Sequence, residues 1–346
     1  MSMTLGLETT CDETSAAVVA DGVRVCSTVV RSQIDLHAKY GGVVPEIAAR
    51  AHLEILNAVI ARAMEQAGVA AEQLDGVGVA NCPGLIGCLL VGVAAAKALA
   101  FAWEKPLVGV NHVHAHLYAI RLQNGSGIAA PPADELWPAL GLVVSGGHTS
   151  MYWMDGFTQL RRIGSTIDDA VGEAFDKVAQ ILQLGYPGGP LVEQLARSGN
   201  PAAIRFPTSL LGRESLDFSF SGLKTAVLYH VNGNKGIERD ASALSRQELA
   251  DVAASFQWTA AEVLAAKCRR ALEHHAAKSL LVGGGVSANE TIRSKLLALG
   301  REMGLKVFLP APEFCTDNAA MIAGLAANEL QAGHQHGLDL PVLATV

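Results

Sequence analysis

The segment Leu5-Gly6-Leu7 is followed by a polar turn, Glu8-Thr9-Thr10-Cys11-Asp12-Glu13, and then by Thr14-Ser15. The same order recurs later, where Leu140-Gly141-Leu142 precedes Val143-Val144-Ser145-Gly146-Gly147-His148 and Thr149-Ser150. Each copy then reaches an Asp-Gly pair, Asp21-Gly22 or Asp155-Gly156, which favours a β-hairpin. The repeat predicts two related lobes, and the alternative is a chance recurrence of common residues. Small side chains in the turns free backbone N–H groups to face an anion, so we expect the turns to grip a phosphate from both sides.

Length and element order predict an α/β protein of two domains, because 346 residues exceed one ordinary core. Strands are predicted at 3–9, 15–20, 23–30, 74–80, 106–111 and 279–283, helices at 46–64 and about 167–182, and a Pro-Gly-Gly-Pro turn at 187–190. The Gly- and Pro-rich residues 123–138 predict a linker. We expect one lobe over 1–122 and a second over 139–317. A helix at 317–332 returns to either lobe, and we assign about 318–346 to the first.

The amino-acid composition argues against several classes of protein. The chain has 26 Lys and Arg against 33 Asp and Glu, a net charge of −7, which does not favour unaided coating of nucleic acid. Its six cysteines are scattered without a Cys-x-x-Cys pair, so neither a disulfide framework nor a zinc ribbon is indicated. The apolar residues 84–103 favour a buried helix over a membrane span. We expect a cytoplasmic protein without a secretory signal and without membrane contact.

Three histidines lie within the segment Asn111-His112-Val113-His114-Ala115-His116, directly after a predicted strand. On a helix, His112 and His116 share one face at a spacing that can hold one metal ion; on a strand, all three histidines share a face. An exposed helix start that happens to carry histidines is the alternative. A zinc peptidase needs Glu beside the first histidine as its base, and Val113 stands there. A third ligand must come from elsewhere in the chain.

Four other segments carry candidate site residues. Gly146 and Gly147 let the backbone approach a ligand closely. The glycines at 283–285, before Ser287 and Asn289, predict either a nucleotide cradle or a tight turn. Carboxylates at 169, 173 and 176 share one helical face, and an ordinary amphipathic helix is slightly favoured for them. Asp317 is a candidate oxygen ligand or simply a helix N-cap.

Taken together, these segments resemble the bacterial TsaD family of tRNA threonylcarbamoyladenosine transferases. The resemblance covers nearly the whole chain in order, through matching blocks at 8–15, 40–46, 112–116, 142–149, 172–177, 186–190, 217–224, 284–289 and 315–318. It departs from the family at two places. Cys82 stands where the family usually has Gly, and His114-Ala115 where it usually has Glu-Gly. Neither departure removes an expected ligand, but each leaves the local backbone shape open.

The resemblance implies a two-lobed fold of the actin, sugar-kinase and Hsp70 type (ASKHA), with duplicated ribonuclease-H-like lobes. It implies one divalent metal ion, iron in preference to zinc, on His112, His116 and Asp317. It implies that the substrate-binding residues are Val143, Val144, Ser145, Gly146, Gly147, Asp176, Gly189 and Asn289. The substrate would be threonylcarbamoyl-AMP. The acceptor would be the N6 amine of the adenosine 3′ of the anticodon in tRNAs that read codons beginning with A, and AMP would leave.

A proton must leave the attacking adenine amine, and Glu13 or Asp12 is the candidate base; a carboxylate pair that only stabilises the turn is the alternative. The family also implies partners: tRNA, a paralogous TsaB-type scaffold and a TsaE-type ATPase. The rival interpretations are an ATP-dependent small-molecule kinase of the same fold, a metallopeptidase, and an inactive scaffold subunit. Arg161-Arg162 and Arg269-Arg270 are only candidate tRNA contacts, because exposed basic pairs usually serve solvation.

Overall fold

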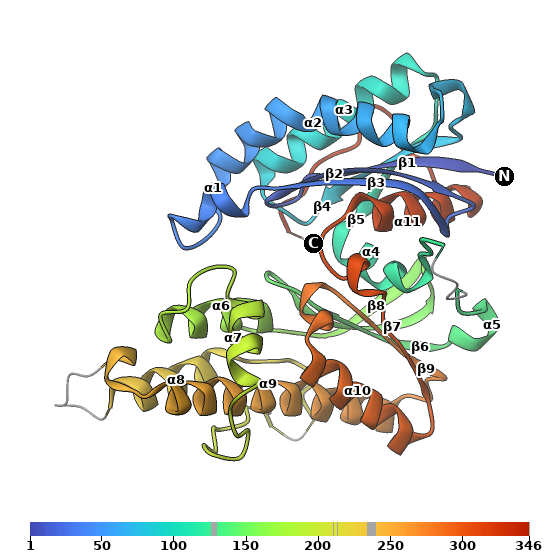
Figure 1. The fold of residues 1–346 in the computed structure, drawn as a ribbon. Coiled ribbons are helices and arrows are strands. Elements are labelled where there is room, and N and C mark those ends of the chain that lie inside the picture. The colour runs from blue at the N-terminus through green and yellow to red at the C-terminus, as the bar shows by residue number, and fades with distance from the viewer. Residues whose placement is uncertain (126–129, 210, 213, 234–239, 346) are drawn as a thin grey trace. The chain divides into compact units, whose positions relative to one another are not determined.

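The computed structural model describes residues 1–125, 130–209, 211–212, 214–233 and 240–345 (Figure 1). The chain divides into two compact units, the first formed by Met1–Pro132 with Pro310–Val346 and the second by Ala133–Leu309. The second unit is therefore an insertion in the chain of the first. Residues 126–129, which belong to the predicted linker, lie outside the described residues.

The first unit is built on a five-stranded sheet in the order β3-β2-β1-β4-β5. Its strands are β1 (Met3–Glu8), β2 (Glu13–Ala20), β3 (Arg24–Ser32), β4 (Gly76–Cys82) and β5 (Leu107–Asn111). The first three form an antiparallel meander, while β4 runs parallel to β1 and β5 parallel to β4. The predicted hairpins therefore form the antiparallel part of a mixed sheet.

The side chains of β1 point alternately to the two faces of the sheet, and this determines which helices pack on each face. Leu5 and Leu7 are fully buried in a core shared with α2 (Pro45–Ala67) and α3 (Ile86–Ala102). Gly6 faces the other side, where a Cβ would lie only 2.4 Å from the Ala319 carbonyl oxygen. α11 (Ala319–Gln331) therefore packs directly on the sheet, beside α4 (His112–Tyr118) and opposite α2 and α3 (Figure 1). The predicted C-terminal helix belongs to the first unit.

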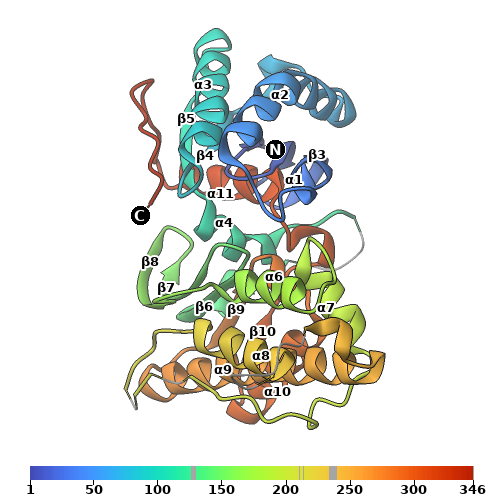
Figure 2. The same cartoon turned by 90° about the vertical axis from the view of Figure 1, so that its left-hand side faces the viewer.

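Short elements complete the first unit: α1 (Ile34–Ala38) and the 3-10 turns Ala71–Gln73, Ala119–Arg121 and Pro312–Phe314. After α11 the chain runs back along β5, where His336 bridges to Leu107 and Leu340 is buried (Figure 2). Asn81 Nδ2 donates to the Pro341 carbonyl at 3.0 Å, and Leu343 N–H donates to the Asn81 carbonyl at 3.0 Å. This return segment ties the end of β4 to the rest of the unit.

The second unit repeats the strand order as β10-β9-β6-β7-β8. Its strands are β6 (Ala139–Val144), β7 (Thr149–Gly156), β8 (Gln159–Ser165), β9 (Ser279–Gly283) and β10 (Lys306–Phe308). The duplication extends to the register: Leu5 pairs with Val18, and Leu140 pairs with Trp153, so both partners move by the same number of positions. Leu140 likewise takes the place of Leu5 beside the parallel neighbour strand.

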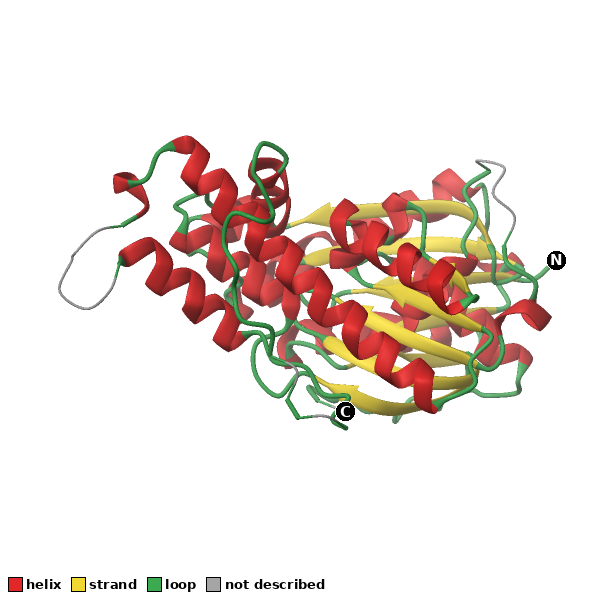
Figure 3. Ribbon diagram, turned by 90° about the horizontal axis from the view of Figure 1, so that it is seen from below, coloured by secondary structure: helices red, strands yellow, loops and turns green. Residues whose placement is uncertain are grey.

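Helices of the second unit are α5 (Ala133–Leu136), α6 (Val171–Ile181), α7 (Gly188–Ala196), α8 (Ser221–Asn232), α9 (Arg246–His274) and α10 (Glu290–Met303). Two further 3-10 turns span Ala241–Ala243 and Gly285–Ala288. Phe175 of α6 and Phe256 of α9 meet edge to face, with ring centroids 4.9 Å apart, in the core. The layering of helices on strands is visible in Figure 3.

Two predicted boundaries are wrong for physical reasons. The predicted turn at 187–190 is the start of α7, because Asp176 Oδ1 accepts the Gly188 N–H at 2.8 Å and satisfies the first turn. The helix predicted from 167 begins only at Val171, because Asp168 is used to accept hydrogen bonds from the start of α8. Among the described residues, no helix is both long and apolar enough to cross a membrane.

Candidate metal centre and substrate-binding residues

The Asn111 side chain starts the helix on which the three histidines lie. Its side chain accepts hydrogen bonds from the N–H groups of Val113 (2.9 Å) and His114 (3.1 Å), so a helix begins at His112 directly after β5. The helical alternative therefore holds, and His112 and His116 lie one turn apart on one face. Their rings meet edge to face, with centroids 4.7 Å apart. Burial lowers the pKa of His114 to about 4, so that imidazole is neutral at physiological pH.

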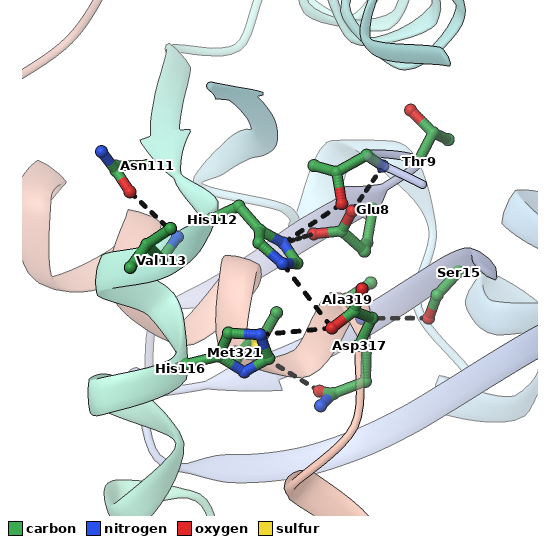
Figure 4. A network of polar contacts seen from close by, with 12 residues as sticks. Glu8, Thr9, Ser15, Asn111, His112, Val113, His116, Asp317, Ala319 and Met321 are labelled. Atoms are coloured by element: carbon green, nitrogen blue, oxygen red, sulfur yellow. Dashed lines mark hydrogen bonds and ion pairs between the residues drawn. The ribbon is translucent and has the colours of Figure 1, made fainter. Parts of the chain in front are cut away.

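Asp317 reaches the same two rings from a distant part of the chain. Asn318 caps α11 by accepting the Met321 N–H, and Ala319 N–H donates to Ser15 Oγ at 3.0 Å, which fixes the start of that helix (Figure 4). Asp317 is thus not the cap. Its Oδ1 lies 3.2 Å from His116 Nε2 and 3.6 Å from His112 Nε2.

The environment of the three groups fits a metal ion. One donor atom from each of His112, His116 and Asp317 lies within 4.8 Å of the others. His116 is fully buried, and neither of its ring nitrogens has a hydrogen-bond partner among the described residues. A buried imidazole whose nitrogens make no hydrogen bond is costly unless something else binds it. Two imidazoles and one carboxylate suit Zn²⁺ or Fe²⁺, and three ligands leave a coordination position for substrate, as in catalytic sites.

Glu8 completes the site from a second layer, and the sequence analysis did not single it out. This fully buried carboxylate lies with Oε2 2.8 Å from His112 Nδ1, while Oε1 accepts the Thr10 N–H at 2.6 Å. Burial alone would lower the pKa of His112, but the charges of Glu8 and Asp317 and the bond to Glu8 raise it to about 9. Glu8 thus holds the hydrogen on Nδ1 and aims Nε2 at Asp317.

The turn between β1 and β2 carries the two candidate bases. Asp12 is buried, and Glu13 Oε1 accepts the Ser32 hydroxyl at 3.1 Å. Burial raises the pKa of Glu13 to about 9, with further contributions from the negative charges of Asp317 and Asp12. In the metal-free chain Glu13 is therefore protonated at neutral pH. Burial also raises the pKa of the neighbouring Cys11 thiol far above its ordinary value, so Cys11 is not a nucleophile.

Five of the eight predicted substrate-binding residues, Val143 to Gly147, lie at the carboxyl end of β6 in the second unit. Gly172 N–H donates to the Ser145 carbonyl at 3.2 Å, and a Cβ on Gly284 would lie 2.4 Å from the Val144 carbonyl oxygen. Val143 pairs with the end of the parallel strand β9. In α/β sheets, ligands bind outside the carboxyl ends of parallel strands. These residues therefore lie where ligands commonly bind in such sheets, and their contact with substrate stays a prediction.

The glycines of this region fall into two classes. At Gly172, Gly188 and Gly284, a Cβ would lie within 2.6 Å of backbone atoms, so these glycines allow close packing. At Gly146, Gly147, Gly189 and Gly285, a Cβ would meet nothing within 4 Å. The open class contains all three glycines for which the family resemblance implies substrate binding. Internal packing does not explain them, and they leave bare backbone toward open space.

Asp176 and Asn289 already have partners within the unit. Asp176 Oδ1 holds the start of α7, as described above. Asn289 caps α10 by accepting the Ile292 N–H at 3.1 Å, and its Nδ2 donates to Gln257 Oε1 at 2.7 Å. These contacts fix both side chains in place. The metal triad with Asp12 and Glu13 belongs to the first unit, and the substrate-binding residues belong to the second.

The chain matches one protein family over most of its length. The family model described as TsaD, tRNA N6-adenosine threonylcarbamoyltransferase, matches residues 24–324. The chain belongs to this family. It is therefore a transferase enzyme, and the kinase, peptidase and scaffold alternatives do not describe it.

Curated relatives of the transferase agree over almost its entire length. The protein from Symbiobacterium thermophilum is 49% identical over 336 residues, covering 97% of this chain and 94% of the relative. The protein from Anaeromyxobacter dehalogenans is 50% identical over 341 residues, covering 98% of each. Both carry the name tRNA N6-adenosine threonylcarbamoyltransferase.

Solved structures confirm the predicted fold class. The ROK hexokinase from Thermus thermophilus matches 96% of the transferase and 100% of its own chain, with a TM-score of 0.50 and 20% sequence identity. At this identity the likeness concerns the fold alone. Together with the two sheets of equal strand order, it assigns the transferase to the actin, sugar-kinase and Hsp70 fold with ribonuclease-H-like units.

Proposed function

We propose that the transferase moves the threonylcarbamoyl group from threonylcarbamoyl-AMP to the N6 amine of the adenosine 3′ of the anticodon, in tRNAs that read codons beginning with A. The match of the family model to residues 24–324 is the observation that carries the proposal. In the reaction, a bond forms between N6 and the carbamoyl carbon. The bond from that carbon to the phosphate oxygen breaks, and AMP leaves.

His112, His116 and Asp317 would hold one divalent ion, with Fe²⁺ preferred and Zn²⁺ the alternative. When bound, this ion would supply Lewis acidity toward a phosphate or carbamoyl oxygen. Glu8 keeps the hydrogen of His112 on Nδ1 and so presents a lone pair at Nε2. The buried His116 ring supports this assignment more directly than the spacing of the histidines does, because its nitrogens make no hydrogen bond among the described residues and Nε2 faces Asp317 at 3.2 Å.

The residues of the second unit would bind threonylcarbamoyl-AMP. Backbone N–H groups at Gly146 and Gly147 are exposed and suited to an anionic phosphate, because no side chain shields them. Val143, Val144 and Ser145 form the strand end that carries this turn. Asp176, Gly189 and Asn289 would complete the site, with Asn289 held in position by Gln257.

Asp12 or Glu13 would accept the proton that leaves the adenine amine. Glu13 is protonated at neutral pH in the metal-free chain, because burial raises its pKa to about 9. To act as base it must lose that proton when the site is filled. Positive charge next to Asp317 favours this loss, because the Asp317 carboxylate is one cause of the raised pKa.

For partners we propose tRNA, a TsaB-type scaffold and a TsaE-type ATPase, in the cytoplasm. The net charge of −7 supports a need for help in binding tRNA.

The test combines purified protein, threonylcarbamoyl-AMP and unmodified tRNA, with and without these partners, followed by mass spectrometry of the nucleosides. We expect threonylcarbamoyladenosine in the complete mixture. A tRNA with guanosine at the acceptor position is the control and should stay unmodified. Absence of the modified nucleoside with all partners present would overturn the proposal.

A further inference from the structure

A buried chain of polar side chains runs beneath the turn that carries Asp12 and Glu13. His37 and His52 are fully buried, and Gln33 is 2% exposed. Gln33 precedes α1, His37 is part of it, and His52 lies in α2. The metal triad and Glu8 do not use these side chains. A buried polar network is costly to build unless each member is satisfied, so its arrangement needs a reason.

The hydrogen bonds of this buried polar network can run in only one direction. Val44 N–H donates to His37 Nδ1 at 3.3 Å, so the hydrogen of a neutral His37 is on Nε2, which faces Gln33 Oε1 at 3.2 Å. Gln33 Nε2 then points its hydrogens at His52 Nδ1 (3.3 Å) and at the Ala48 carbonyl (3.3 Å). His52 Nδ1 is therefore an acceptor, and its Nε2–H donates to the Cys11 carbonyl at 3.0 Å.

The Thr14 hydroxyl is compatible with this assignment for His52. The Thr14 hydroxyl lies 2.7 Å from His52 Nδ1, and it can donate only if that nitrogen has no hydrogen. A proton on Nδ1 would face the Gln33 amide, which can only donate, although the Thr14 hydroxyl could turn and accept it. Burial also lowers the pKa of His52, which agrees with a neutral ring.

The buried polar network ends on the turn itself, where hydrogen bonds from other segments hold three consecutive residues. Cys11 C=O accepts from His52, Asp12 C=O accepts the Gln33 N–H at 2.9 Å, and Glu13 Oε1 accepts the Ser32 hydroxyl. These three acceptors are thus fixed by residues at 32–33 or by His52. The direction of the two acidic side chains follows from this attachment.

We propose that His52 is a positioning residue for the transfer reaction, which orients the Asp12–Glu13 turn through its bond to the Cys11 carbonyl, with Gln33 and His37 fixing its tautomer. This inference rests on the proposed function, because it gives the turn a part in proton transfer. His52 does not touch the substrate and does not bind the metal. Its removal should therefore slow turnover and leave metal content unchanged.

The first experiment measures the wild-type protein. Long-range ¹⁵N–¹H correlation spectra of the imidazoles in the wild-type protein report which ring nitrogen carries hydrogen. We expect His37 and His52 both to carry it on Nε2 at pH 7, with the two signals assigned by His37→Gln and His52→Gln. Hydrogen on Nδ1 of either ring, or a charged His52, would overturn the inference.

The second experiment compares His52→Phe with His52→Gln in the complete transfer assay. We expect His52→Phe to lower kcat about 10- to 100-fold, since small misplacements of reacting groups have effects of this size. KM for threonylcarbamoyl-AMP and bound metal should match wild type. The Gln amide can donate to the Cys11 carbonyl and should restore much of kcat. His274→Phe, at an exposed position of α9, is the matched control and should behave as wild type.

Equal kcat for His52→Phe and wild type would overturn the inference, and so would loss of metal together with kcat. If His52→Phe does not fold, the tautomer measurement decides alone. An inactive wild-type protein would count against the proposed function, while the spectra would still test the hydrogen-bond chain.

Discussion

Glu8 Oε2 lies 2.8 Å from His112 Nδ1, and both side chains are buried. The pair joins the end of β1 to the start of α4, so the first strand of the sheet also sets the orientation of a predicted metal ligand. A carboxylate behind a metal-binding imidazole fixes its tautomer and raises its basicity. The site therefore depends on a residue that would not touch the ion.

Replacing Glu8 with Gln should weaken metal binding. The amide can still accept the Thr10 N–H, but it lacks the charge that holds the hydrogen on His112 Nδ1. We expect affinity for Zn²⁺ or Fe²⁺ to fall about 10- to 100-fold, measured by competition with a chromogenic chelator. Glu54→Gln, at an exposed position of α2, is the control. Unchanged affinity in Glu8→Gln would show that the carboxylate has no part in the site.

The stability of the metal-free protein should fall as pH rises from 6.5 to 8. Folding raises the pKa of His112 from 6.5 to about 9, so its stabilisation is complete below pH 6.5 and is lost as the pH approaches 9. Glu13, raised from 4.5 to about 9, acts in the same direction. Above pH 8 the loss is opposed by Lys267, whose pKa burial lowers to about 8.

Thermal unfolding of the chelator-treated protein measures this dependence as the change of Tm with pH. Glu13→Gln should flatten the dependence, because one of the two titrating groups is gone. Saturation with Zn²⁺ should also flatten it between pH 6.5 and 8, since the ion would displace the proton from His112 Nε2. A Tm that rises between pH 6.5 and 8 would contradict the pKa values of both groups.

Two glycine substitutions should separate substrate binding from packing. Gly146→Ala adds a methyl group where nothing lies within 4 Å, so the fold should tolerate it while the KM for threonylcarbamoyl-AMP rises by roughly tenfold, about 1.4 kcal/mol. Gly172→Ala places the same group 2.5 Å from the Ser145 carbonyl oxygen and should destabilise the fold by about 1–3 kcal/mol. Urea unfolding and initial rates measure the two effects. A Gly146→Ala enzyme with wild-type KM would remove this turn from the substrate site.

The return segment after α11 should contribute to stability through Leu340. This side chain is 3% exposed, and its Cδ1 would lie 2.5 Å from a Cβ on Gly109. Leu340→Ala should lower the free energy of unfolding by about 2–3 kcal/mol, as measured by urea denaturation. Leu343→Ala, at a position that is 46% exposed, is the control and should change it little. Equal values for the two variants would mean that the segment is not part of the core.

Local patterns made the fold and part of the site predictable. The paired strands follow from the repeated Leu-Gly-Leu segments, and the structure confirms both pairs with the same register. The predicted turn at Asp21-Gly22 is confirmed, whereas the prediction for Asp155-Gly156 is wrong, because these residues end β7 and the turn is formed by residues 157–158. The pairing of His112 and His116 follows from the helix period once Asn111 caps the helix. The structure places their rings together with Asp317, and their role as ligands stays a prediction.

Contacts between distant segments were not predictable from local patterns. Glu8 meets His112 across 104 residues, and no periodicity in the sequence relates the two. The segment at 187–190 has the composition of a turn, yet the carboxylate of Asp176 captures its N–H and starts a helix. The place of Asp317 came from family resemblance, because its spacing to the histidines carries no geometric information.

The insertion of the second unit within the first has a consequence for biosynthesis. During translation, His112 and His116 leave the ribosome early, whereas Asp317 follows only after the whole of Ala133–Leu309 has been made. A nascent chain thus carries the two imidazoles before Asp317 and before α11, the helix that packs on the sheet, have been made. Loading of the proposed metal ion would therefore be a late event, because a chain that ends before Asp317 lacks one of the three proposed ligands.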